Sequence, residues 1–354
     1  MLCCARCQAL GHHKMKILAV GDSYMPSRYF ASAFAHLERE HEIRYVELAG
    51  ATPFVASTPS ELRLREYLGS PAPVMERMAG VEVLAVHGAP ITDEVLDASP
   101  ELRLVGCARG GPVNVDRESL RARGLTLVNT PGKNAEAVAD LTLAMMVILA
   151  RQLTASERHV RGGQRVNDNW EGGRFMGADL RDHVLGVIGY GQIGQRVAQR
   201  ARAFGMAVIV YDPYVTAVDA DQAAELEELL GQADFVSLHA RASAENENLI
   251  DAAALAAMRP GAYLVNTARE TLLDEAALDA ALASGHLAGA ALDVFTPDAP
   301  AYLLRHENVV LTPHIGGATH DTLLQGAQML AEEVARFAAG EPLENVVDAP
   351  AVSA

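Results

Sequence analysis

The chain has 354 residues, with 29 Lys and Arg against 45 Asp and Glu, which gives a formal net charge of −16. A length above about 250–300 residues favours two domains, because a single hydrophobic core rarely grows further. The negative charge would repel a phosphate backbone, so we expect no nucleic acid partner. The longest apolar run, at residues 141–150, is shorter than the roughly 18 residues of a membrane span, so we expect no membrane partner.

Residues 1–14 precede the first strand-like run and are predicted to form a disordered extension. Cys4 and Cys7 have the spacing of half a zinc site, but no second cysteine pair follows, so we expect no metal. Four cysteines do not make a disulfide scaffold in a chain of this length, and the N-terminus lacks the charged and apolar stretches of a secretion signal. We therefore expect a cytoplasmic protein.

Short apolar runs separated by helical or turn-rich sequence predict buried strands in the first part of the chain. These runs lie at residues 16–21, 45–48, 83–86 and 104–107. Residues 135–151 are rich in Ala, Leu and Met and contain no Pro or Gly, which predicts a long helix. We expect this helix to join two domains.

A second series of apolar runs follows the long helix, and segments typical of helices separate most of them. The runs lie at residues 184–189, 207–211, 235–239, 262–266, 288–292 and 309–312. Alternating strands and helices predict a parallel, doubly wound α/β sheet with right-handed crossovers. A last helix is predicted at 321–339, where Gly340 and Pro342 end it.

A glycine-rich motif, Gly189-Tyr190-Gly191-Gln192-Ile193-Gly194, follows the predicted strand at 184–188 and opens a helix. The first glycine permits a tight turn, the second lets the backbone approach a pyrophosphate, and the third lets helix and strand pack closely. Asp212 ends the next strand, where a carboxylate can accept hydrogen bonds from an adenosine ribose. This context predicts a dinucleotide site.

Polar residues follow several of the predicted strands, and ligands of open α/β sheets bind at the carboxyl ends of the strands. These residues are Asp212, His239, the run Asn266-Thr267-Ala268-Arg269, Asp293 and the run Thr312-Pro313-His314. Taken singly, each is also explained as a turn or capping residue. Together they predict one ligand-binding edge.

The chemistry of this edge fits hydride transfer to or from a hydroxy acid, which needs a base, a cation for the carboxylate and a dinucleotide. His314 can be the base, because imidazole titrates near ~6.5. Arg269 can be the cation, because its planar guanidinium pairs with a carboxylate through two hydrogen bonds. A carboxylate near His314 would hold the imidazole and stabilise its charged form.

Several ordered motifs now define a resemblance that extends over residues 15–347. They are Asn129-Thr-Pro-Gly-Lys-Asn134-Ala-Glu-Ala-Val138, the glycine motif at 189–194, NTAR at 266–269, ALDVF at 291–295 and TPHIGGAT at 312–319. In these motifs the chain resembles the D-isomer-specific 2-hydroxyacid dehydrogenase family, which includes 3-phosphoglycerate dehydrogenases and glyoxylate or hydroxypyruvate reductases. The resemblance implies an NAD-dependent enzyme that moves a hydride between nicotinamide and C2 of a small D-2-hydroxy acid.

The resemblance implies roles for particular residues. Arg269 would bind and polarise the substrate, His314 would be the acid/base, and Asp298 would assist the histidine. Asp293 would contact the nicotinamide carboxamide. The other expected cofactor-binding residues are Gly189, Gly191, Gln192, Ile193, Gly194, Asp212, His239, Thr267, Ala268 and Val138. The expected substrate-binding residues, besides Arg269, are His87, Gly88, Arg109, Gly110, Gly111 and Asn134.

The resemblance also implies a Rossmann NAD-binding domain at 133–317. A smaller, flavodoxin-like substrate-binding lid domain is expected at 15–132 and 318–348, with the protein as a homodimer. Arg109 has two interpretations, a surface arginine or a second cation for a phosphate or distal carboxylate of the substrate. The alternative function is an NAD-sensing, corepressor-like regulator on the same fold.

Three positions depart from the family pattern. Asp298 stands where the family usually has Glu, and the loop from it to His314 is shortened. Glu270 replaces the glycine usual after the catalytic arginine, and the substrate loop reads Arg109-Gly-Gly-Pro-Val-Asn114. The resemblance therefore does not determine which hydroxy acid is the substrate.

Overall fold

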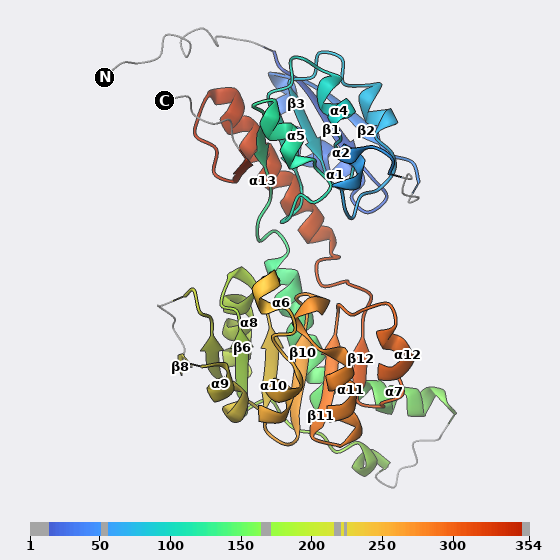
Figure 1. Cartoon of the computed structure of the whole chain (residues 1–354), viewed down its shortest axis with the longest axis vertical. Helices are drawn as coiled ribbons and strands as arrows, with labels where there is room; N and C mark the ends of the chain where they lie inside the picture. Colours follow the sequence, from blue (N-terminus) through green and yellow to red (C-terminus); the bar gives the residue numbers. More distant parts are fainter. Residues whose placement is uncertain (1–13, 51–55, 164–170, 216–220, 223–224, 349–354) are drawn as a thin grey trace. The chain divides into compact units, whose positions relative to one another are not determined.

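The computed structural model describes residues 14–50, 56–163, 171–215, 221–222 and 225–348, and all but the last residue of the predicted extension at 1–14, Cys4 and Cys7 included, lies outside these ranges. The chain divides into two units (Figure 1). Unit 1 consists of residues 1–133 and 319–354, and unit 2 of residues 134–318. The assignment of these units to substrate and cofactor stays a prediction at this point.

Unit 1 is built on a sheet whose strands have the order β13-β5-β4-β3-β1-β2. The strands are β1 (Lys16–Gly21), β2 (Glu42–Glu47), β3 (Val83–Val86), β4 (Leu104–Cys107), β5 (Thr126–Val128) and β13 (Val346–Asp348). Only β13 pairs antiparallel, with β5. The helices are α1 (Arg28–Phe34), α2 (Pro59–Leu62), α3 (Ala72–Met75), α4 (Asp93–Asp97), α5 (Arg117–Ala122) and α13 (His320–Ala339), with a 3-10 turn at Leu37–Arg39.

The central strands of unit 1 are apolar throughout because both faces of the sheet are covered. Ile17 of β1 packs with α1 and α13 on one face, whereas Leu18 packs with α3, α4 and α5 on the other. β2 lies at the edge and is only half-buried, and its alternating charged residues explain why the apolar pattern revealed only part of it. The sequence analysis also missed β5 and β13, which have three residues each.

Unit 2 contains a parallel sheet with the strand order β12-β11-β10-β9-β6-β7-β8. The strands are β6 (Val184–Ile188), β7 (Ala207–Tyr211), β8 (Asp221–Gln222), β9 (Phe235–Leu238), β10 (Ala262–Asn266), β11 (Leu287–Leu292) and β12 (Val309–Leu311). The order reverses at β6, between β7 and β9, so the doubly wound sheet predicted from the sequence is confirmed.

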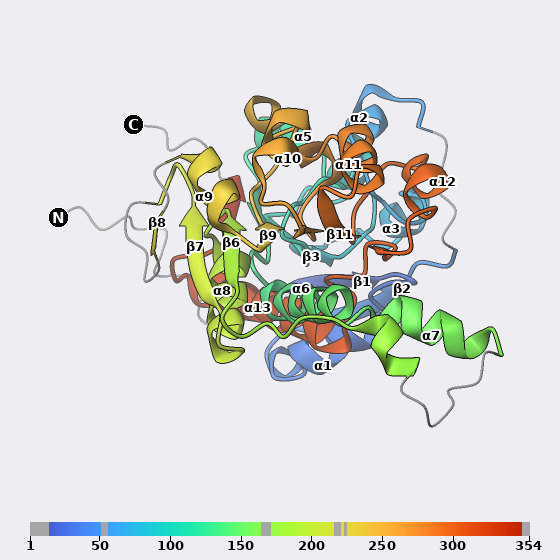
Figure 2. The ribbon, with the colours of Figure 1, turned by 90° about the horizontal axis from the view of Figure 1, so that it is seen from below.

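Helices cover both faces of the unit 2 sheet. They are α6 (Ala135–Ala150), α7 (Leu153–Arg161), α8 (Gln192–Ala203), α9 (Leu226–Gln232), α10 (Ala252–Ala257), α11 (Glu275–Ala283) and α12 (Ala299–Leu303), with 3-10 turns at Glu171–Phe175, Ala244–Asn246 and Glu270–Leu272. α6 and α8 pack on one face, and the helices from α9 to α12 pack on the other. α7 has no buried residue and extends away from the strands (Figure 2).

Among the described residues, no single helix is long and apolar enough to cross a membrane. α6 and α7 together reach the length and hydropathy of a span. The two helices are bent by 66° at the break between them, and most apolar side chains of α6 are buried inside unit 2.

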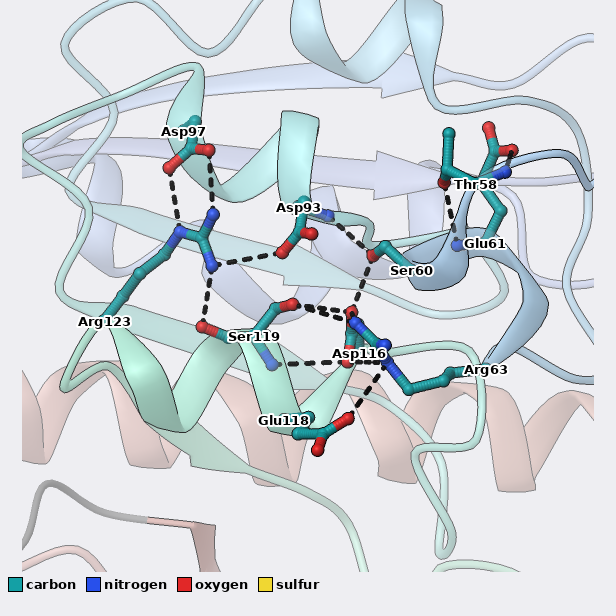
Figure 3. A network of polar contacts seen from close by, with 10 residues as sticks. All are labelled: Thr58, Ser60, Glu61, Arg63, Asp93, Asp97, Asp116, Glu118, Ser119 and Arg123. Carbon is teal, nitrogen blue, oxygen red and sulfur yellow. Dashed lines mark hydrogen bonds and ion pairs between the residues drawn. The ribbon is translucent and has the colours of Figure 1, made fainter.

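A polar network fixes the segment around α2 to α5 in unit 1 (Figure 3). The carboxylate of Asp116, whose side chain is fully buried, accepts hydrogen bonds from Ser60 Oγ at 2.6 Å and from Arg63 Nε at 2.9 Å. It also accepts one from Ser119 Oγ at 2.7 Å and caps the first turn of α5. Burial alone would raise the pKa of Asp116, but the hydrogen bonds from Arg63, Ser60 and Ser119 hold it well below its usual value.

Replacing Asp116 with alanine should lower the free energy of unfolding by about 2–4 kcal/mol, because several donors lose a buried acceptor. The folded-state pKa is depressed, so the contribution of Asp116 is present above about pH 4 and is lost as pH falls below that value. Urea unfolding at pH 7 and pH 3 measures both effects. Glu118→Ala is the matched control, since Glu118 is exposed and lies 3.4 Å from the same Arg63; an equal loss in both variants would contradict the prediction.

Candidate active site

The glycine motif follows β6 and forms the turn into α8. Gly189 has φ +92°, and a Cβ at this position would lie 2.5 Å from the backbone nitrogen of Ala240. A Cβ at Gly194 would lie 2.1 Å from the carbonyl oxygen of Gly189, so only glycine lets the helix pack on the turn. Gly191 is the N-cap of α8, and the space beside its Cα is open. The open position at the helix N-terminus is suited to a pyrophosphate.

Asp212 follows β7 and contacts the glycine turn directly. Its carboxylate accepts hydrogen bonds from the backbone N–H of Tyr190 at 2.7 Å and of Tyr214 at 2.9 Å. A carboxylate has about four acceptor positions, so two remain for hydroxyl groups. Asp212 therefore holds the nucleotide turn in place as well as standing where a ribose is expected.

Arg269 follows β10 on a turn that Asn266 fixes. The buried Asn266 side chain accepts from the N–H of Ala268 at 3.0 Å and donates to the carbonyl oxygen of Arg269 at 2.9 Å. Arg269 itself is exposed, and its guanidinium donates to the carbonyl oxygen of Ala268 at 2.7 Å. No ion pair joins it to any residue that the structure describes. Its charge is thus available for a carboxylate ligand.

Asp293, at the end of β11, organises the loop that carries His314. Its side chain is buried, and it accepts hydrogen bonds from Thr312 Oγ1 at 2.5 Å, Ile315 N at 2.8 Å and Gly316 N at 2.7 Å. The sequence analysis assigned Asp293 to the nicotinamide carboxamide, which stays a prediction. The structure adds that this carboxylate supports the loop that carries His314.

His314 is held in an unusual backbone conformation with its side chain exposed. It has φ +54°, in the left-handed region that non-glycine residues rarely adopt. Its N–H is directed at the carbonyl oxygens of both Asp293 and Thr312, each at 2.9 Å. Such strain persists only where the surroundings impose it and is frequent at functional sites. The loop therefore presents the imidazole outward at the carboxyl end of the sheet.

Asp298 is exposed and directly precedes α12. No hydrogen bond or ion pair among the described residues joins Asp298 to His314, so their pairing stays a prediction. The segment before it is anchored by the buried Glu275, which accepts a hydrogen bond from Thr296 N at 2.9 Å. The sequence analysis missed Glu275, because an acidic residue in the first turn of a helix is typical of an exposed position.

The remaining predicted residues of unit 2 lie around this edge. Val138 is buried next to Gly316, and Asn134 lies against Gly317. The hydroxyl of Thr267 lies 3.0 Å from that of Thr142 on α6, and Ala268 is buried. His239 Nε2 lies 2.8 Å from Ser237 Oγ, and burial lowers the pKa of this histidine. Their direct contacts with a cofactor or substrate stay predictions.

In unit 1, His87 follows β3 and pairs with a residue that the sequence analysis missed, Asp22. His87 Nδ1 lies 2.9 Å from Asp22 Oδ2, and the ring stacks on Tyr24 with 5.4 Å between centroids. The backbone N–H of Gly88 donates to the same Oδ2 at 2.8 Å. Burial lowers the pKa of His87 and outweighs the opposing effect of Asp22. The neutral ring then donates from Nδ1 to Asp22 and keeps Nε2 as an acceptor.

Arg109, Gly110 and Gly111 follow β4. Arg109 is mostly buried and forms an ion pair with the exposed Glu66, and its Nη1 donates to the Glu66 carbonyl oxygen at 2.6 Å. Asn129 Nδ2 donates to the carbonyl oxygen of Gly110 at 2.8 Å. The Arg109 side chain is 19% exposed, and both interpretations of it, a surface arginine and a second cation for the substrate, stay predictions.

The turn at Gly189, the parallel sheet and the residues at its carboxyl edge define unit 2 as a dinucleotide-binding domain of the kind found in dehydrogenases. Residues 143–316 match the family described as "D-isomer specific 2-hydroxyacid dehydrogenase, NAD binding domain". A glyoxylate reductase of Thermococcus litoralis is 35% identical over 285 residues, which cover 78% of this chain and 86% of that protein. The chain belongs to the D-isomer specific 2-hydroxyacid dehydrogenase family.

Further comparisons agree with this membership. A D-3-phosphoglycerate dehydrogenase of Mycobacterium tuberculosis is 39% identical over 274 residues, 75% of this chain and 51% of that protein. The chain thus spans about half the length of the phosphoglycerate dehydrogenases it matches. The crystal structure of the TT0316 protein from Thermus thermophilus is 34% identical, with a TM-score of 0.74 over 94% of this chain and all of that one. The family and the Rossmann-type fold expected from the sequence are confirmed.

Proposed function

We propose that the protein is an NAD-dependent oxidoreductase that transfers a hydride between nicotinamide and C2 of a small D-2-hydroxy acid or the matching 2-keto acid. The observation that carries this proposal is the presence of Arg269 and His314, exposed and without side-chain ion pairs among the described residues, at the same sheet edge as the glycine turn. The comparisons name reductases and dehydrogenases and give no support to the alternative of a regulator.

Each group has a distinct task in reduction of a 2-keto acid. Gly191 and the N-terminus of α8 would hold the pyrophosphate of the cofactor, which supplies the hydride when bound. Arg269 binds the substrate carboxylate through two hydrogen bonds. His314 donates a proton to the oxygen on C2 as that carbon is reduced, and in the reverse direction it removes the hydroxyl proton. We propose that Asp298 stabilises the imidazolium form of His314.

A direct test follows NADH absorbance with glyoxylate, hydroxypyruvate, phosphohydroxypyruvate and longer 2-keto acids. Reduction of at least one of them, yielding the D-hydroxy acid, is the expected result. The relatives' names suggest the first three compounds. No oxidation of NADH with any 2-keto acid, by a folded protein that binds NADH, would overturn the proposal.

We expect a preference for NADH over NADPH of at least about tenfold in kcat/KM, because Asp212 would meet a 2′-phosphate with like charge. Two unit charges about 4 Å apart interact by about 4 kcal/mol at an intermediate dielectric, before screening by salt. The variant Asp212→Asn should narrow the preference while one side-chain oxygen remains for Tyr190. Equal catalytic efficiency of the parent enzyme with the two cofactors would contradict this prediction.

We further propose that the enzyme is a cytoplasmic homodimer, with no nucleic acid or membrane partner. Exposed apolar side chains on and after α7, namely Leu153, Val160 and Met176, support a contact surface between two copies of the chain. The net charge of −16 supports the absence of a nucleic acid partner. Light scattering during gel filtration tests the dimer. A monomer at micromolar concentration would contradict it.

A further inference from the structure

Glu275 is a buried carboxylate whose hydrogen bonds within the described residues all go to the segment that carries Asp298. It is the first residue of α11, and 6% of it is exposed. Its Oε1 accepts from the backbone N–H of Thr296 at 2.9 Å, and its Oε2 accepts from the hydroxyl groups of Thr296 and, at 3.3 Å, of Tyr302. Burial and the charge of Glu275 raise the pKa of Tyr302, so its hydroxyl keeps the proton that it donates. Glu275 therefore holds the chain both before and after Asp298.

The start of α11 does not need the Glu275 side chain. Asp274 is the N-cap of this helix and accepts from the backbone N–H of Ala277 at 2.9 Å, which satisfies a free donor of the first turn. A glutamate is seldom buried, and burying a carboxylate is unfavourable unless hydrogen bonds compensate for the lost water. The donors of the Asp298 segment, and not the helix, therefore account for the burial of Glu275.

Asp298 stands on a short turn whose two sides are fixed in different ways. α12 has five residues, and the Asp298 carboxylate makes no capping hydrogen bond to it. Ala299 and Leu303 are fully buried, which fixes α12 itself on the core of unit 2. The turn in front of α12 is closed by a backbone hydrogen bond of 3.1 Å from Ala299 N to the carbonyl oxygen of Thr296. The place of this turn therefore depends on how Thr296 is held.

The same segment begins beside His314. Asp293 directly follows β11, and its carbonyl oxygen accepts from the backbone N–H of His314 at 2.9 Å. Thr296 and Asp298 follow Asp293 within five residues. The attachments at Asp293 and at Glu275 together restrict where the Asp298 carboxylate can lie relative to the imidazole. A misplacement of about 1 Å can lower an enzymatic rate by about 100-fold, and aspartate has one methylene less than glutamate to correct it.

Asp279 offers a matched comparison on the same helix. It lies four residues after Glu275, which places both on one face of α11. Its carboxylate lies 2.7 Å from His306 Nε2 and forms an ion pair with Arg305. Both carboxylates therefore attach the connection between β11 and β12 to α11. Asp279 holds the end of this connection near β12, whereas Glu275 holds the part that carries Asp298.

We propose that Glu275 is a positioning residue, which holds Asp298 where it stabilises the protonated form of His314. The inference rests on the proposed dehydrogenase function and on the proposed role of Asp298. It gives Glu275 a part in the reaction that acts entirely through Asp298.

The first test compares three variants in steady-state kinetics over a range of pH. Glu275→Ala removes the acceptor, so we expect kcat for 2-keto acid reduction to fall by about 10- to 100-fold and the fall in rate at high pH to move to lower pH. Glu275→Gln should restore most of kcat and the parent profile, because Oε1 can still accept from Thr296 N while the hydroxyl groups turn to accept from the amide. Asp279→Asn should change kcat by less than about twofold and leave the profile unchanged.

A double-mutant cycle separates positioning from a general loss of structure. Adding Glu275→Ala to Asp298→Asn should lower kcat further by less than about threefold, because the group that Glu275 positions is then already absent. A merely structural role would lower kcat by the same factor in both backgrounds. If Glu275→Ala does not fold, as thermal unfolding will show, Thr296→Val takes its place. This variant removes the hydroxyl donor and keeps the backbone N–H to Oε1, so it should shift the pH profile in the same direction with a smaller loss of kcat.

The outcomes for the inference and for the proposed function differ. Suppose that the parent enzyme reduces a 2-keto acid. An unchanged pH profile in Glu275→Ala or, where that variant does not fold, in Thr296→Val would then overturn the inference alone, as would equal factors in the two backgrounds of the cycle. If the parent reduces no 2-keto acid, the proposed function fails and the inference fails with it.

Discussion

Replacing His314 with alanine should lower kcat for keto-acid reduction by about 100- to 10,000-fold, the range for removal of a general acid. The imidazole is exposed and holds no other part of the loop, since the loop is fixed through backbone groups and Asp293. The variant should therefore fold normally and bind NADH with a Kd within about threefold of the parent. Steady-state kinetics and NADH fluorescence titration measure the two quantities, and an unchanged kcat would show that another group transfers the proton.

The variant Asp298→Asn tests whether Asp298 is the partner of His314. If Asp298 stabilises the imidazolium form of His314, its loss should shift the fall in reduction rate at high pH to a lower pH, because fewer histidines remain protonated. Asp298→Glu should be tolerated only partly, since the added methylene must fit a shortened loop. A pH profile of Asp298→Asn identical to that of the parent would mean that Asp298 only precedes α12, and the search for the assisting carboxylate would move to Glu270.

The cofactor edge was predictable because its causes are local. The glycines of the turn into α8 are required by contacts with Ala240 and Gly189 at the same sheet edge, and strands buried on both faces appear as continuous apolar runs. The sequence analysis missed β5, β8 and β13, which have two or three residues each, whereas the equally short β12 lies in the apolar run at 309–312. The three missed strands form because neighbouring strands supply their hydrogen-bond partners. Their own residues therefore do not reveal them in the sequence.

The pairing of Asp22 with His87 and the burial of Lys133 in unit 1 could not be predicted in the same way. His87 was already a predicted substrate-binding residue, and Asp22 also directly follows a strand, so the rule applied to the second half of the chain would have identified Asp22 as well. Their pairing depends on β1 and β3 being neighbours in the sheet. The burial of Lys133 depends on Gly326, which comes from the far end of the chain and packs against it only in the folded unit. A lysine in a turn otherwise predicts an exposed side chain.

Asp293→Asn should reduce kcat by about 100-fold or more and lower the free energy of unfolding by about 2–3 kcal/mol. Both carboxylate oxygens of Asp293 now accept hydrogen bonds, from Thr312 and from two backbone N–H groups. In Asp293→Asn an NH2 group replaces one of these oxygens, so a donor would face a donor and at least one of these hydrogen bonds would be lost. The loop would then release His314 from its left-handed conformation, so that the acid/base is no longer held where it acts.

The same variant distinguishes loop support from the nicotinamide contact expected for Asp293. If loop support dominates, the NADH Kd should change by less than about tenfold while kcat and the unfolding midpoint both fall. Thr312→Val offers a milder form of the same defect, because it removes one donor to Asp293 Oδ1 and leaves the two backbone donors in place. It should show a smaller loss of kcat in the same direction. A raised NADH Kd with unchanged stability in Asp293→Asn would instead assign this carboxylate to the cofactor.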